Sequence, residues 1–295
     1  MSFFESFQKI YYYFIIIINI ILFLYIIFTI LIPKSKIIRH PHDIFSSHIT
    51  FIESHRGVVK EIFQNTLESF SRAIKYNIEA LETDVWLTKD NVSVLYHGYQ
   101  NGSFLDRYYD HPGKVIDLTY DELSTYRTIN DSLQMPKLSE AMKLTKNKIF
   151  MNLEIKDPRI DLVFPHIIKL IEKYNFFEQI SLSSFHHGYY NKIEEYNKNN
   201  KKNLIFGFLY HKDEPEIFYD FTKRGNSLNI YWENISKEVC DKAHNNGMAV
   251  LAWFKLIDEE NDEIYRELIQ NGVDVICSNE PVKAKKFRDN YFKKK

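Results

Sequence analysis

Charged side chains stand two residues apart in two otherwise apolar stretches of this 295-residue sequence. Glu82 and Asp84 lie in EALETDVWL, and Glu154 and Lys156 lie in KIFMNLEIK. Alternate residues of a β-strand point to the same face, so each pair is presented together. Carboxylates that converge raise one another's pKa unless a cation lies between them, and ligands that are all oxygen suit Mg²⁺ or Ca²⁺ rather than zinc. Glu82, Asp84 and Glu154 are therefore the predicted metal ligands. The alternatives are a solvent-exposed strand face for the first pair, which its apolar neighbours disfavour, and an ordinary ion pair for the second.

Two histidines and two cationic side chains stand at the ends of similar apolar runs. His55 and Arg56 follow ITFIES, and His97 ends VSVLYH. Imidazole titrates near neutral pH, so His55 and His97 are the candidate general acid and base. Arg56 and Lys156 supply positive charge for an anionic substrate, and with a metal these groups suit phosphodiester cleavage. Trp253, near the end of MAVLAWF, is a candidate substrate-binding wall or an ordinary core residue. A surface pair at His55 and Arg56, and a hairpin cap at His97, are the simpler alternatives.

The elements that must position these residues follow from the apolar pattern. Short apolar runs alternate with amphipathic stretches, which indicates a parallel sheet covered by helices. Nine strands are expected, at 49–54, 79–87, 92–97, 148–156, 179–184, 203–208, 227–232, 248–254 and 273–278. Only four residues separate the second and third, and parallel neighbours need a dozen or more, so those two form an antiparallel hairpin. The remaining eight strands predict a (β/α)8 TIM barrel, whose active site lies at the C-terminal strand ends.

Two details of this barrel are also predicted. The stretch from about 98 to 136 is rich in Tyr and Asp and has weak periodicity, so it is expected to be an insertion on the catalytic rim. Polar residues before amphipathic runs predict helices that begin after Thr66, Ser236 and Asp258, and the glycine at 272 predicts the end of the last of these.

The N-terminal part of the chain has a different composition. Residues 10–32 carry no charge and are dominated by Ile, Phe, Leu and Tyr, and about 20 such residues cross a bilayer as a helix. The run lacks the basic start and small-residue cleavage site of a secretory signal. Basic residues follow it at 34–39, which predicts a single-pass anchor with the C-terminal part on the cytosolic side. The expected organisation is an anchor and basic flank at 1–40 and a barrel at 48–288.

Overall composition excludes several classes of partner and site. The formal net charge is −1, so no long-range field attracts nucleic acid. Only two cysteines, Cys240 and Cys277, are present, and both lie in apolar segments. A disulfide scaffold or a cysteine-based zinc site is therefore not expected.

Several motifs occur in the same order as in a known family. HRGVVKEIFQNTLESFSRAI is followed by ALETDVWLTKDNVSVLYH, MNLEIK, LAWF and GVDVICSNEP, and this series resembles the glycerophosphodiester phosphodiesterase family. The resemblance implies a metal-dependent TIM barrel that cuts a glycerophosphodiester into glycerol 3-phosphate and an alcohol. At the matching positions it implies the same roles for the two histidines, the three carboxylates and the two cations. In one mechanism proposed for the family, the substrate's own glycerol hydroxyl attacks first and water then opens a cyclic phosphate.

Two positions depart from the family pattern, and two alternatives to the expected function stay open. Gln64 stands where the motif has glutamate, and Gly98 stands where an aspartate usually follows the second histidine. The expected enzyme is a phosphoric diester hydrolase, and its membrane anchor adds lysophospholipids as candidate substrates, which would make it a lysophospholipase D. The first alternative is a membrane-tethered phospholipid-binding module with lost or weak catalysis. A phosphoinositide-cleaving lyase on a similar barrel is the second.

Overall fold

The computed structural model describes residues 15, 18–19 and 49–293. Contacts divide the chain into two units, residues 1–36 and 37–295, and the described elements β1–β9 and α3–α10 belong to the second. The anchor predicted at 10–32 lies outside the described residues except for three positions. Among the residues that are described, no helix has the length and apolar character that crossing a bilayer requires.

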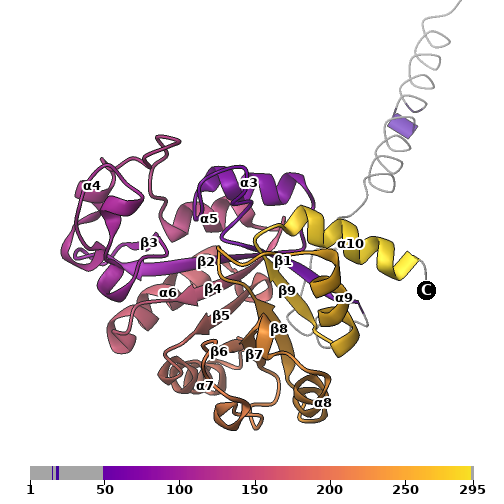
Figure 1. The fold of residues 1–295 in the computed structure, drawn as a ribbon. Helices are drawn as coiled ribbons and strands as arrows, with labels where there is room; N and C mark the ends of the chain where they lie inside the picture. The colour runs from indigo at the N-terminus through magenta and orange to yellow at the C-terminus, as the bar shows by residue number, and fades with distance from the viewer. Residues whose placement is uncertain (1–14, 16–17, 20–48, 294–295) are drawn as a thin grey trace, which may run out of the picture. The chain divides into compact units, whose positions relative to one another are not determined.

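Eight parallel strands close into a barrel (Figure 1). Their order around the barrel is β1, β9, β8, β7, β6, β5, β4, β2, and pairing of β1 with β2 completes the circle. The strands are β1 (Phe51–His55), β2 (Ala80–Leu87), β4 (Phe150–Ile155), β5 (Ile180–Ser184), β6 (Phe206–Leu209), β7 (Ser227–Tyr231), β8 (Ala249–Trp253) and β9 (Val275–Ser278). The (β/α)8 barrel predicted from the sequence is confirmed.

The ninth strand, β3 (Ser93–Leu95), is the return arm of a hairpin. It pairs antiparallel with the end of β2, where Val85 faces Leu95. The four-residue connection left no room for a crossover, as the spacing predicted. The hairpin extends β2 beyond the barrel wall and carries the chain toward the catalytic rim.

Helices cover the outside of the barrel after seven of its eight strands (Figure 1). They are α3 (Leu67–Lys75), α5 (Leu138–Thr145), α6 (Ile160–Tyr174), α7 (Gly188–Asn200), α8 (Lys237–Asn245), α9 (Asp262–Asn271) and α10 (Pro281–Lys293). Between β6 and β7 the described structure has only a 3-10 turn, η5 (Glu216–Phe218). The apolar faces of strands and helices meet in one large buried cluster that surrounds the barrel.

Helix starts agree with the sequence at two positions and differ at a third. Thr66 forms a capping box with Ser69 at the start of α3, and the Ser236 side chain accepts a hydrogen bond from a backbone N–H at the start of α8. The cap predicted at Asp258 is wrong, because Asn261 accepts from the first N–H groups of α9. Asp258 Oδ2 instead accepts from the backbone N–H of Lys255, at 2.7 Å, and so closes the loop before the helix.

The segment between β3 and α5 forms a small apolar core of its own. It contains the 3-10 turns η1 (Gln100–Gly102), η2 (Leu105–Arg107) and η3 (Val115–Asp117) and the short helix α4 (Tyr120–Leu123). Buried side chains from these elements pack with side chains of the hairpin, among them Trp86 and Tyr96. This insertion is therefore anchored to the hairpin that ends in His97.

Candidate active site

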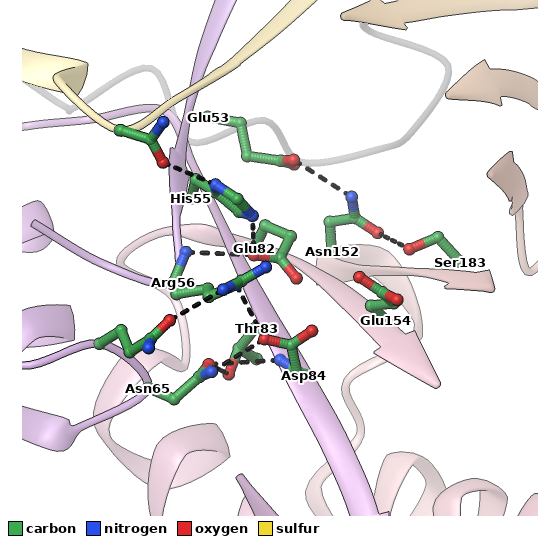
Figure 2. Close-up of polar contacts among 12 residues, drawn as sticks. Glu53, His55, Arg56, Asn65, Glu82, Thr83, Asp84, Asn152, Glu154 and Ser183 are labelled. Atoms are coloured by element: carbon green, nitrogen blue, oxygen red, sulfur yellow. Dashed lines mark hydrogen bonds and ion pairs between the residues drawn. The ribbon is translucent and has the colours of Figure 1, made fainter. Parts of the chain in front are cut away.

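Three carboxylates from neighbouring strands meet inside the barrel. Glu82 and Asp84 project from β2 and Glu154 from β4, and Asp84 is the register partner of Glu154. One oxygen from each lies within 4.8 Å of the others, and all three residues are buried. The structure thus brings together the three residues that the sequence predicts as metal ligands (Figure 2).

The donor set suits a hard cation. Among the described residues, Glu82 Oε1 is buried without a hydrogen-bond donor, which is unfavourable unless another group satisfies it. Glu154 Oε1 and Asp84 Oδ1 are also buried and lie 2.9 Å and 3.7 Å from the Lys156 ammonium. Burial, and then the charge of Asp84, raises the pKa of Glu82. Burial also raises the pKa of Glu154, against the opposing effect of Lys156. A divalent ion among these oxygens would relieve both penalties, and an all-oxygen set is the one Mg²⁺ and Ca²⁺ prefer.

Arg56 is held rigidly beside this cluster. Its backbone N–H donates to the Glu82 carbonyl at 3.0 Å and to Glu82 Oε2 at 3.1 Å, while its φ of 58° places it in the left-handed region. Its Nε lies 3.0 Å from Asp84 Oδ2, and Nη1 donates to Gln64 Oε1 at 2.8 Å. Burial would raise the pKa of Asp84, but Arg56 first, and then His97 and other neighbours, outweigh it and lower that pKa.

Lys156 is the second cation of the site. Its Nζ lies 2.9 Å from Glu154 Oε1 and 3.7 Å from Asp84 Oδ1. Burial lowers the pKa of Lys156, but Glu154 and Asp84 outweigh this effect and raise it, so the amine is charged. Both predicted phosphate-binding cations therefore adjoin the carboxylates.

His55 is fixed by a residue near the other end of the chain. Its Nδ1 lies 2.7 Å from Asn279 Oδ1, and Asn279 Nδ2 donates to the Lys255 carbonyl at 2.8 Å. Because that carbonyl takes the amide N–H, the amide oxygen faces the ring, and Nδ1 carries the proton. The other nitrogen, Nε2, lies 3.9 Å from Glu82 Oε2 and holds a lone pair. Burial, and then Arg56, lower the pKa of His55 to about 3, so the ring is neutral.

A buried carboxyl group supports Asn279 from behind. Glu260, at the end of the β8–α9 loop, accepts from the Asn279 backbone N–H at 2.7 Å and from the Tyr265 hydroxyl at 2.8 Å. It also accepts from the Ser278 hydroxyl. These bonds fix the turn between β9 and α10, and with it the side chain that orients His55.

His97 reaches the same site from the hairpin. Its carbonyl accepts from Trp86 Nε1 at 3.1 Å, and its ring centroid lies 5.9 Å from that of Tyr99. Burial, and then Arg56, lower the pKa of His97, whereas Asp84 acts in the opposite direction. The field of the carboxylate cluster and its cations therefore acts on both imidazoles.

The site opens into a cavity of about 890 Å³, which is within the size range of small-molecule sites. Both histidines, both cations and two of the three carboxylates line it. Trp253 also lines it, with its indole packed on Tyr231 at 5.1 Å and against the edge of Phe185 at 6.0 Å. Within the part of the chain that the structure describes, Trp253 Nε1 has no hydrogen-bond partner. The indole is therefore both a wall of the cavity and an unused donor.

Comparison with known proteins identifies the family. Residues 55–283 match the model of the glycerophosphoryl diester phosphodiesterase family. The chain belongs to this family. The predicted enzyme class, a phosphoric diester hydrolase, is confirmed by the same match and by its relatives.

Individual members of the phosphodiesterase family align over most of the chain. A glycerophosphodiester phosphodiesterase of Caldanaerobacter subterraneus is 29% identical over 244 residues, which are 79% of this chain and 95% of the relative. One from Bacillus altitudinis is 26% identical over 252 residues, 82% of this chain and 99% of the relative.

Solved structures agree with the barrel assignment. A proposed glycerophosphodiester phosphodiesterase of Galdieria sulphuraria is 28% identical with a TM-score of 0.73, over 82% of this chain and 98% of that one. An Oleispira antarctica phosphodiesterase, crystallised with sn-glycerol-3-phosphate, is 19% identical with a TM-score of 0.70, over 83% and 99%. The second comparison supports the fold alone.

The two departures from the family pattern have local explanations in this phosphodiesterase. Gln64 contacts Arg56, and its amide oxygen accepts from the guanidinium as a carboxylate would, without the charge. Gly98 has a φ of +51°, and a Cβ built there would lie 2.6 Å from Cε1 of Tyr96. The packing of Tyr96 therefore leaves no room for an aspartate.

Two residues of the site were not assigned a role from the sequence. Asn279 orients His55, and Asn65, with a φ of 55°, donates from Nδ2 to Asp84 Oδ2 at 2.8 Å. Both lie in motifs that the sequence displays, Gln64-Asn65-Thr66 and SNEP, so the signal was present. Their partners are distant in sequence, and only the closed barrel reveals them.

Proposed function

We propose that this phosphodiesterase hydrolyses glycerophosphodiesters to glycerol 3-phosphate and an alcohol with the help of one divalent cation, Mg²⁺ or Ca²⁺. The observation that carries the proposal is the convergence of three buried carboxylates, with one oxygen of each within 4.8 Å of the others, beside Arg56 and Lys156. Glu82, Asp84 and Glu154 would hold the ion, which would stabilise negative charge on the phosphoryl oxygens as a Lewis acid. With the ion bound and the acids ionised, the group carries one net positive charge, which matches a singly charged phosphodiester.

The two histidines would move protons in opposite directions. His55 Nε2, which carries a lone pair, accepts the proton of the hydroxyl that attacks phosphorus, whether this belongs to water or to the substrate's glycerol. The bond from phosphorus to the leaving alcohol then breaks, and the alkoxide takes a proton from His97. The pKa of His97 is low in the free site, and a bound phosphate anion beside the ring raises it. Substrate binding therefore favours the protonated form of His97, which can then act as the acid.

We propose lysophospholipids as the more specific substrate class, which would make the enzyme a lysophospholipase D. Ile257 and Tyr99 line the cavity and are 90% and 50% exposed, and Phe104 packs on Tyr99 at 5.2 Å. Arg107 lies over the Phe104 ring, 4.3 Å from its centroid. Exposed apolar side chains next to a cation suit the boundary between lipid headgroups and acyl chains.

We also propose that the protein is anchored in a membrane. Residues 1–40 would form a single-pass membrane anchor, and the barrel at 48–288 would face the cytosol. This rests on the uncharged run at 10–32 and the basic residues after it. No nucleic acid partner is proposed.

The test uses the full chain in detergent with glycerophosphocholine and lysophosphatidylcholine, each with Mg²⁺, Ca²⁺ or EDTA. We expect release of choline that EDTA abolishes and that is lost in His55→Ala. His166→Ala, on the outer helix α6, is the matched control and should retain activity. Binding without release would identify the phospholipid-binding module instead. Persistence of a cyclic phosphate would identify a lyase, and release that EDTA does not affect would refute the metal assignment.

A further inference from the structure

A row of polar side chains lies inside the barrel below the proposed catalytic groups. Glu53 Oε1 accepts from Asn152 Nδ2 at 3.1 Å, and Asn152 Oδ1 accepts from the Ser183 hydroxyl at 2.9 Å (Figure 2). Glu53 precedes His55 by two residues on β1, and a strand rises about 3.3 Å per residue. Glu53 therefore points to the same interior as His55, about 6.6 Å further along the strand toward its N-terminal end.

This polar row is unusual for its place in the fold. Barrel interiors of this type are filled mainly by layers of branched apolar side chains, and one such layer is present here at the N-terminal strand ends. It consists of Phe51, Ala80, Phe150 and Val275, with Leu251 above it. The polar residues lie between this apolar plug and the carboxylate cluster.

The barrel wall also makes room for a fourth polar side chain. Asn229 Oδ1 accepts from the Ser227 hydroxyl at 2.8 Å, and a Cβ built on Gly207 would lie 2.4 Å from Asn229 Nδ2. Only glycine at 207 lets this amide occupy the interior. Glu53, Asn152, Ser183 and Asn229 all line the same cavity as the proposed catalytic groups.

The two ends of the cavity differ in chemistry. The deep end is closed by the apolar plug and lined by carboxyl, amide and hydroxyl groups, whereas the open end carries Trp253, Phe185 and Ile257. Glu53 is 2% exposed and has no ion pair among the described residues. Burial raises the pKa of Glu53 to about 7, and its Oε1 accepts from Asn152 Nδ2.

We propose that Glu53, Asn152 and Asn229 form a hydroxyl-binding floor that holds the terminal hydroxyl of the substrate's glycerol. This rests on the proposed function, and it fixes the direction in which the substrate lies. The glycerol end of an unacylated substrate, which is small, enters the closed polar end, and among lysophospholipids the floor selects those whose terminal hydroxyl is free rather than acylated. The variable alcohol points to the open apolar end.

The test compares two diesters that differ by one hydroxyl. One is sn-glycero-3-phosphocholine, and the other is its 1-deoxy analogue, which keeps the hydroxyl next to the phosphate-bearing carbon. We expect the wild-type chain to favour the first by at least about tenfold in kcat/KM, because a buried polar site rejects a ligand that leaves it unpaired. In Glu53→Leu the ratio should fall toward one, mainly through KM. In Ser183→Ala, which removes only one oxygen, it should fall by about two- to fivefold.

A structural role for the floor would lower both activities together and leave their ratio unchanged. An unchanged ratio in Ser183→Ala and in Glu53→Leu would overturn the proposal, and so would a wild-type ratio near one. If the wild-type chain cleaves neither diester, the proposed function fails but the floor is still tested by calorimetry. Glycerol 3-phosphate should then bind about tenfold tighter than its 1-deoxy form, and Glu53→Leu should abolish the difference.

Discussion

Gly98 offers a test of whether packing, rather than loss of function, explains a departure from the family pattern. Its φ of +51° lies in the left-handed region, and a Cβ there would lie 2.6 Å from Cε1 and 2.9 Å from Cδ1 of Tyr96. Tyr96 cannot easily move, because it is 2% exposed, its hydroxyl donates to the Ser103 carbonyl at 3.0 Å, and its ring packs against Tyr109.

The expected size follows from two separable contributions. The left-handed conformation costs a residue with a Cβ about 1–2 kcal/mol, and overpacking of a buried site costs a further ~1–3 kcal/mol. Gly225 separates them, because its φ is +81° but nothing lies within 4 Å of a Cβ built there. Gly225→Ala should therefore show the backbone contribution alone, and Gly98→Ala should show both.

The assay is thermal unfolding of the full chain in detergent, wild type against each alanine variant. A domain of this size loses about 2–4 °C in Tm per kcal/mol, so the overpacking cost alone should make Gly98→Ala unfold about 2–12 °C below Gly225→Ala. Equal losses in the two variants would refute the crowding argument. Gly98→Asp, which restores the family residue, should lower kcat because it displaces the adjoining His97. A higher kcat in that variant would show that the aspartate, not the packing, is what the site lacks.

Three further outcomes are expected. Asn279→Ala should lower kcat about 10- to 100-fold with little change in KM, because an outer partner that orients a catalytic ring typically has that effect; a change in KM alone would contradict the orienting role. Gln64→Glu should raise the affinity for the divalent cation and also raise KM for the phosphodiester, since it adds negative charge beside the guanidinium that we propose binds phosphate; activity measured against metal and substrate concentration decides, and a lower KM would count against this reading. Hydrogen bonding to Asp274 raises the pKa of His244, so that pair stabilises the fold fully below the ordinary histidine pKa and loses its effect as pH rises through the raised value. The Tm difference between wild type and His244→Gln should therefore be larger at pH 5.5 than at pH 9, and a difference independent of pH would exclude the linkage.

The parts of the site that follow strand periodicity could be predicted from the sequence. Residues at i and i+2 share a face whatever the rest of the fold does, so the pairing of Glu82 with Asp84 needed only the recognition of one strand. Predicting that Glu154 lies beside this pair also required the strand order. The short connection after β2 excludes β3 as a parallel neighbour of β2, which leaves β4 as the next parallel strand.

Contacts that depend on closure of the barrel could not be predicted from the sequence. His55 and Asn279 are 224 residues apart and meet only because β9 pairs with β1. Asp258 and Asn261 have similar propensities to cap a helix. In the structure Asp258 closes the loop before α9, and Asn261 caps the helix. The floor around Glu53 escaped notice because a single carboxylate in an apolar run carries no periodic signal of its own.

Gln64 and Gly98 show that the effect of a departure from a motif depends on the contacts of the residue as well as on its identity. Each one, taken alone, suggests a weakened site, since one removes a charge and the other removes a carboxylate beside a proposed catalytic ring. Gln64 nevertheless keeps the hydrogen bond to Arg56, and that guanidinium still lies 3.0 Å from Asp84. Gly98 is the residue that Tyr96 permits, and Tyr96 belongs to the apolar core that anchors the hairpin bearing His97. The contacts of Arg56 and the packing around His97 are thus accounted for at both positions, and the physical difference from the family pattern is two negative charges, one next to Arg56 and one beside His97.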